Sequence, residues 1–84
     1  MTTTVNQRNL FQTFDLGLAG TLITIGFHLR SLDKSNPRKV QFGFNDSDNI
    51  KRATEAYWSG KIKVNPRLYF DNLKLLKNRI YSNV

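Results

Sequence analysis

The chain of 84 residues contains no cysteine, two prolines and a single histidine. The absence of cysteine excludes disulfides and thiolate metal sites, and it favours a reducing compartment, so we expect a cytoplasmic location. Since no second histidine or suitably spaced carboxylates accompany His28, we expect no transition-metal site and no other bound cofactor. Acidic residues are also scarce: six stand against thirteen basic ones, which gives a formal net charge of +7.

Long hydrophobic runs are missing too. The longest apolar stretch, residues 16–27, is interrupted by three glycines and two threonines and is too short to span a bilayer. Residues 1–8 contain no apolar segment of the kind found in signal peptides, so we expect neither export nor membrane insertion. The hydrophobic fraction of 39% suffices for one core. We therefore predict a flexible tail over 1–9 and a single domain over 10–82.

No pattern typical of catalysis is present. The serines lack the glycine context of a nucleophile elbow, and Gly17 and Gly20 do not form a phosphate-binding loop. Asp46 and Asp48 resemble part of a calcium loop, but the required glycine and terminal glutamate are absent. We therefore expect no catalytic residues and predict that the protein is not an enzyme.

Hydrophobic periodicity and capping residues predict the secondary structure. The expected elements are a strand over 10–14, a helix capped by Asp15 and ended by Gly26, strands over 27–32 and 39–44, a helix from about 50 to 58, an extended segment over 61–64 that could be an edge strand, and a helix over 66–81. The order β-α-β-β-α-(β)-α predicts an α+β fold, with a small antiparallel sheet and helices packed on one face.

Three apolar patterns predict the core. Val40, Phe42 and Phe44 alternate along one strand, which indicates a half-buried strand with an aromatic inner face. The last helix should pack through a single apolar seam, formed by Tyr69, Leu73, Leu76 and Ile80. The first helix should bury Leu18, Ala19, Leu22 and Ile23, whereas Thr21 and Thr24 fall outside this face, and its glycines suggest close packing on the sheet.

Several short segments, taken in order, resemble a family of small bacterial, phage and plasmid domains catalogued only as a domain of unknown function. The segments are Phe11-Gln12-Thr13-Phe14-Asp15-Leu16, Gly26, Asp33-Lys34, Val40-Gln41-Phe42-Gly43-Phe44-Asn45-Asp46, Tyr57-Trp58-Ser59-Gly60, Val64, Pro66-Arg67 and Leu73-Lys74-Leu75-Leu76-Lys77-Asn78-Arg79-Ile80-Tyr81. The resemblance implies no activity and no functional residue. It does imply a setting on mobile elements.

Positive charge is concentrated in the second part of the chain. Up to Asn49 the basic and acidic residues balance to +1, whereas from Ile50 onward the balance is +6. Such a concentration is typical of proteins that bind polyanions, most often nucleic acid. On a helical wheel of the last helix, Arg67 and Lys74 point in nearly the same direction, and Lys77 lies about 60° from Lys74 around the helix axis. Together with Lys61 and Lys63 they predict a patch of five cations; a solvated helix face is the alternative.

The predicted hairpin loop is a second candidate site. The loop residues Ser35-Asn36-Pro37 are flanked by Arg30, Lys34, Arg38 and Lys39, and a basic β-ribbon can enter a nucleic-acid groove, with Ser35 and Asn36 as candidate contacts to bases or phosphates. An ordinary polar turn explains the same residues and is preferred.

Aromatic residues lie close to the basic segment in the sequence. Tyr57 and Tyr69 fall on apolar faces and are assigned to the core. Trp58 and Phe70 lie off these faces; an exposed ring could stack on a base, but we expect both to be buried or half-buried. Trp58 is kept as a candidate contact.

We therefore predict a small accessory protein of a phage or plasmid that binds nucleic acid, DNA rather than RNA, mainly through phosphates. The alternative is a protein–protein interaction module that inhibits a host defence or nucleic-acid-processing complex, with a host or phage protein as its partner. The segment 61–64 could also pair edge to edge in a homodimer.

Overall fold

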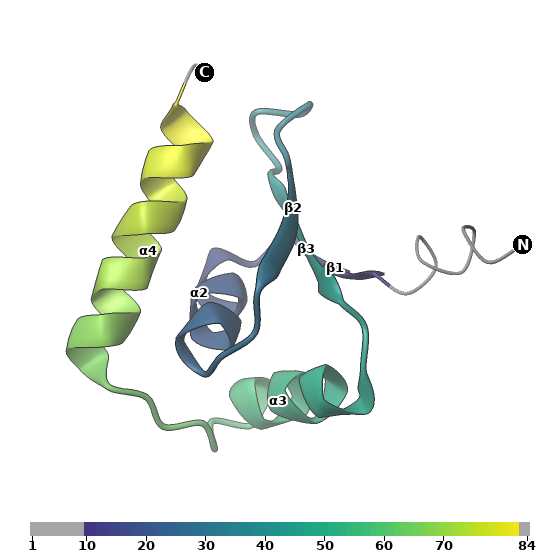
Figure 1. Ribbon diagram of the computed structural model, residues 1–84, viewed down its shortest axis with the longest axis vertical. Coiled ribbons are helices and arrows are strands. Elements are labelled where there is room, and N and C mark those ends of the chain that lie inside the picture. Colours follow the sequence, from purple (N-terminus) through teal and green to yellow (C-terminus); the bar gives the residue numbers. More distant parts are fainter. Residues whose placement is uncertain (1–9, 83–84) are drawn as a thin grey trace, which may run out of the picture.

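The computed structural model describes residues 10–82 and contains a three-stranded sheet and three helices (Figure 1). In chain order these are β1 (Leu10–Thr13), α2 (Leu16–Thr24), β2 (Leu29–Asp33), β3 (Gln41–Asn45), α3 (Asp48–Trp58) and α4 (Pro66–Tyr81). The predicted tail over 1–9 lies outside the described residues. The α+β fold is confirmed, with the strands and helices in the expected order.

The sheet is antiparallel and β3 is its central strand, in the order β1-β3-β2. Phe44 lies opposite Phe11 and Leu29, and Phe42 lies opposite Thr13 and Leu32. Opposed residues point to the same face of a sheet, so these rows form one inner face. The alternation of residues 40–44 therefore predicted this strand and its aromatic inner face correctly, whereas its central position follows only from the structure.

Each helix begins at a side chain that accepts a hydrogen bond from the first turn. Asp15 Oδ1 accepts from Leu18 N at 2.7 Å, Ser47 Oγ from Ile50 N at 3.1 Å, and Asn65 Oδ1 from Leu68 N at 3.0 Å. These bonds satisfy backbone donors that have no partner within the helix. Pro66 fills the first position of α4, where its missing N–H costs nothing.

Two glycines end α2 and α3. Gly26 and Gly60 have φ values of 116° and 73°, in the left-handed region that favours glycine. Phe27 N then donates to Leu22 O at 2.9 Å, and Lys61 N donates to Ala56 O at 2.8 Å, as in a Schellman motif. The bond made by Phe27 N explains why β2 starts at Leu29, two residues later than predicted.

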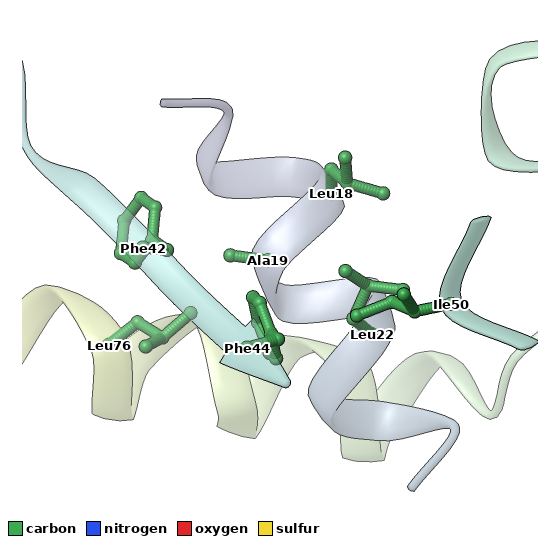
Figure 2. Packing of buried hydrophobic residues seen from close by; sticks show 7 residues of the cluster. All are labelled: Leu18, Ala19, Leu22, Phe42, Phe44, Ile50 and Leu76. Atoms are coloured by element: carbon green, nitrogen blue, oxygen red, sulfur yellow. The ribbon is translucent and has the colours of Figure 1, made fainter. Parts of the chain in front are cut away.

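The core lies between β3 and the helices (Figure 2). Figure 2 shows Phe42 and Phe44 of β3 against Ala19 and Leu22 of α2, with Leu76 of α4 beside them. The fully buried apolar residues are Leu18, Ala19, Leu22, Phe42, Phe44, Ile50 and Leu76. All three helices thus contribute to one core on one face of the sheet.

Helix α2 is buried on more sides than predicted, because it packs against both α3 and α4 as well as the sheet. Thr21, expected outside the apolar face, is only 4% exposed. The expectation that the helix glycines face the sheet is wrong. A Cβ on Gly20 would lie 2.7 Å from Leu73 Cδ2 of α4, and one on Gly17 would meet the hydroxyl of Tyr57 of α3. These glycines therefore let the other two helices approach α2.

The segment 61–64 follows α3 without forming a strand, so the edge strand that it could have formed is absent from the described residues. Its side chains alternate as expected, with Lys61 and Lys63 exposed and Ile62 and Val64 half-buried, but within residues 10–82 it pairs with no strand. The Lys61 amide is already bound to the last turn of α3, and the segment runs directly into α4 (Figure 1). The edge strand that suggested a homodimer is therefore missing from this part of the chain.

Two adjacent leucines test the orientation of α4. Leu76 is 2% exposed and Leu75 is 60% exposed. Leu76→Ala should lower the free energy of unfolding by about 2–5 kcal/mol, because it removes a buried side chain and leaves a cavity. Leu75→Ala should change it by less than about 1 kcal/mol. Urea denaturation of both variants checks this; similar losses would mean that α4 is rotated about its axis.

Candidate nucleic-acid interface

The flank of α4 that lies beside its buried seam carries cations and aromatic rings. Because Tyr69, Leu73, Leu76 and Ile80 face the rest of the protein, residues 70, 74, 77 and 81 come together on one exposed side of the helix. We call this side, with Arg67 at its start, the α4 basic stripe: Arg67, Phe70, Lys74, Lys77 and Tyr81. From Arg67 to Lys77 it extends about 15 Å along the helix axis.

Carboxylates neutralise little of this stripe. Within residues 10–82 the ion pairs are Arg67 with Asp71 and Lys51 with Asp46, each with 3.7 Å between nitrogen and oxygen. The Arg67 side chain is 86% exposed, so this pair is weak and open to exchange with a phosphate. Lys74 and Lys77 have no carboxylate partner in the described part of the chain. Their positive charge is available to an external anion.

The rings on and near the stripe are exposed, contrary to expectation. Phe70 is 57% exposed and Trp58 is 62% exposed, whereas both were expected to be buried or half-buried. Tyr81, the last residue of α4, is 77% exposed. Lys74 Nζ lies 5.3 Å from the centre of the Phe70 ring, within cation–π range. Residues 70, 74, 77 and 81 are spaced four, three and four apart, and this helical spacing could have predicted that they share one side of α4.

Lys61, Lys63 and Trp58 lie at the end of the molecule where α4 begins. Trp58 is the last residue of α3 and stacks edge-on against Tyr57, with 4.9 Å between the ring centres. Both lysines are exposed on the link that leads to Asn65 and Arg67. The end of α3 and the link that follows it therefore lead to the start of α4 (Figure 1).

The hairpin loop lies at the other end of α4 (Figure 1). Arg38 and Lys39 are exposed there, and Lys39 Nζ lies 4.8 Å from the centre of the Phe14 ring. The loop's polar side chains stabilise the turn: Asn36 Oδ1 accepts from Arg38 N at 3.0 Å. The nine predicted contact residues are thus spread along the length of α4 and do not form one compact patch.

Asp33 belongs to the same turn. Its Oδ1 accepts a hydrogen bond from Ser35 N at 2.9 Å. Hydrogen bonds from the Ser35 backbone and hydroxyl lower the pKa of Asp33 below its ordinary value, because they stabilise the carboxylate. The turn therefore carries a negative charge between its basic residues, which weakens it as a site for phosphate.

Lys34 has a structural role that sequence reasoning missed. Its Nζ donates to Arg79 O at 3.0 Å and to Ser82 O at 2.9 Å, at the carboxyl end of α4. A cation at this end donates hydrogen bonds to carbonyl groups that have no partner within the helix, and it offsets the partial negative charge of the helix dipole. These two bonds join residues that are 45 and 48 positions apart in the chain, so no local pattern could reveal them. Lys34 therefore ties the hairpin to α4, and its ammonium group is already engaged.

Residues 10–82 contain no group of three His, Asp or Glu side chains that could hold a metal ion. Over the same residues, no helix is long and apolar enough to cross a membrane.

The described residues thus form a small α+β domain with an exposed basic and aromatic helix flank. The chain belongs to the family described as Domain of unknown function (DUF5659), whose model matches residues 8–82. This confirms the resemblance to a family without an assigned activity. Comparisons with curated proteins and with solved structures give no match.

The role of Lys34 can be tested by hydrogen exchange. Lys34→Gln should speed exchange of the last-turn amides of α4 about two- to fivefold, because loss of a cation at a helix carboxyl end costs about 0.3–1 kcal/mol. Lys39→Gln, in the same loop, removes the same charge without touching α4 and should leave these amides unchanged. Equal effects of the two substitutions on these amides would contradict a stabilising role of the bonds from Lys34 to α4.

Proposed function

We propose that the protein is a non-enzymatic nucleic-acid-binding protein that uses the α4 basic stripe. The single observation that supports this most strongly is the placement of Lys74 and Lys77, without carboxylate partners in the described residues, between the exposed rings of Phe70 and Tyr81. Cations interleaved with exposed aromatic rings suit a ligand that offers both phosphates and flat bases.

Phosphate contacts would supply most of the affinity. Each lysine or arginine that neutralises a phosphate releases condensed counterions, which favours binding and makes it salt-dependent. Three cations lie on the stripe itself, Arg67, Lys74 and Lys77, and two more, Lys61 and Lys63, are exposed on the link that leads to it. If all five meet phosphates, the slope of log affinity against log salt should be about −4.5 on duplex DNA and about −3.5 on single strands.

The exposed rings favour single-stranded over duplex nucleic acid. Bases of a duplex are stacked on each other and cannot lie on Phe70 or Tyr81, whereas those of a single strand can. Stacking contributes about 1–3 kcal/mol per base and tolerates any sequence. We take single-stranded DNA as the first candidate and RNA as the second.

The biological setting forms the rest of the proposal. A small basic domain that binds single strands with little sequence preference would suit an accessory protein of a phage or plasmid, whose replication exposes such strands. This setting is an expectation from the sequence resemblance, and the description of the matching family names no setting.

A salt titration with matched charge variants tests the phosphate contacts. Lys74→Gln with Lys77→Gln should weaken binding to all sequences about equally and reduce the magnitude of the salt slope by about 1.4 on single strands, because two phosphate contacts are lost. Lys51→Gln with Arg52→Gln removes the same net charge from α3, where Lys51 pairs with Asp46 and Arg52 donates to Asn49. This second variant should change the slope much less. Fluorescence anisotropy on labelled oligonucleotides measures both. A slope near zero, or equal effects of the two variants, would contradict the proposed interface.

The role of the rings is tested by a second matched pair. Phe70→Leu should weaken binding to single strands about fivefold or more and leave duplex binding nearly unchanged, because only unstacked bases can use the ring. Phe14→Leu is the control: Phe14 is 50% exposed and also lies beneath a lysine, but away from α4. If Phe14→Leu has the larger effect, the hairpin side is the interface instead.

A further inference from the structure

The opposite flank of α4 borders an apolar cleft. The cleft lies between α4 and the turn from α2 to β2, and its volume is about 580 Å³. Its apolar walls are Ile23, Phe27, Leu29, Leu75 and Leu76. Volumes of 300–1,000 Å³ with mostly apolar walls are typical of small-molecule sites. Leu75, at 60% exposure, places apolar surface in water here, which a ligand would cover.

One end of the cleft is cationic. Arg79 lines this end, and none of the lining residues within 10–82 carries a carboxylate. A smaller hollow of about 350 Å³ adjoins this end; it shares Arg79 and Ser82 with the cleft and adds Arg30 and Lys34. Two polar groups around the cleft already have partners. The Lys34 ammonium donates to two backbone carbonyls, and Asn72 Nδ2 donates to Thr24 Oγ1 at 2.9 Å. The Arg79 guanidinium, by contrast, has no carboxylate partner within residues 10–82.

We propose that this cleft binds an apolar carboxylate, namely an unbranched aliphatic chain whose carboxylate group pairs with Arg79. The apolar walls match the chain, and the guanidinium fork matches two carboxylate oxygens. The cleft volume of about 580 Å³ lies within the range of small-molecule sites, and we take a chain of about ten carbons as the first ligand to test. This site is separate from the α4 basic stripe, so it does not depend on the proposed nucleic-acid binding.

Chain length and head group supply the test. Hexanoate, octanoate and decanoate, each kept below the concentration at which it forms micelles, are titrated into the ¹⁵N-labelled full chain. Affinity should rise about two- to fourfold per added methylene, since burial of each methylene in the cleft is favourable. The shifted amides should cluster in residues 23–29 and 72–79. Decanol and decyltrimethylammonium, with the same chain but no negative charge, should bind at least tenfold more weakly.

Two arginines of the same helix give a matched pair of variants. Arg79→Gln should weaken decanoate binding about tenfold and leave the salt slope for nucleic acid nearly unchanged. Arg67 lies on the other flank of α4, so Arg67→Gln should leave decanoate binding intact. A folded Arg79→Gln variant that binds decanoate normally would overturn the assignment.

Other results would also overturn the proposed site. These are the absence of decanoate-induced shifts at the cleft, equal binding of decanol and decanoate, or shifts spread over the surface. Cleft amides that shift with protein concentration alone would mean that a second copy covers the cleft, which is equally incompatible with a ligand site.

Discussion

The packing of α4 across α2 is the contact on which the rest of the structure depends. Gly20 brings the two helices close, because Leu73 of α4 occupies the space that a side chain at this position would need. Leu76 then reaches the core beside Phe42 and Phe44 (Figure 2). These contacts fix the rotation of α4 about its own axis. That rotation decides which side chains of the last helix face water and which face the core.

Two different surfaces follow from this one rotation. On one flank, Lys74 and Lys77 stand between exposed rings, and local carboxylates neutralise little of the charge. On the other flank, Leu75 and Arg79 border an apolar cleft with a cationic end. Lys34 holds the hairpin against the carboxyl end of the helix and so supports both surfaces.

Features encoded locally could be predicted from the sequence, and those that arise from tertiary contacts could not. The cap at Asp15 and the glycine at 26 set the ends of α2 through bonds to neighbouring residues, so pattern alone located them. The burial of Thr21 depends on three neighbouring elements, and the bond of Lys34 to α4 joins distant segments. The exposure of Trp58 and Phe70 likewise depends on how α3 and α4 pack. Residues 61–64 alternate like a strand, but the Lys61 amide is already bound to the end of α3.

We propose that the flank of α4 from Arg67 to Tyr81 is the surface that binds nucleic acid. Its most direct test is an NMR titration of the ¹⁵N-labelled chain with a short single-stranded DNA at low salt, read amide by amide. We predict that the largest shifts occur along residues 67–81 and in the link over 61–65, while the turn over 33–38 changes little. Shifts confined to that turn or to the exposed face of the sheet, with α4 unchanged, would contradict the account.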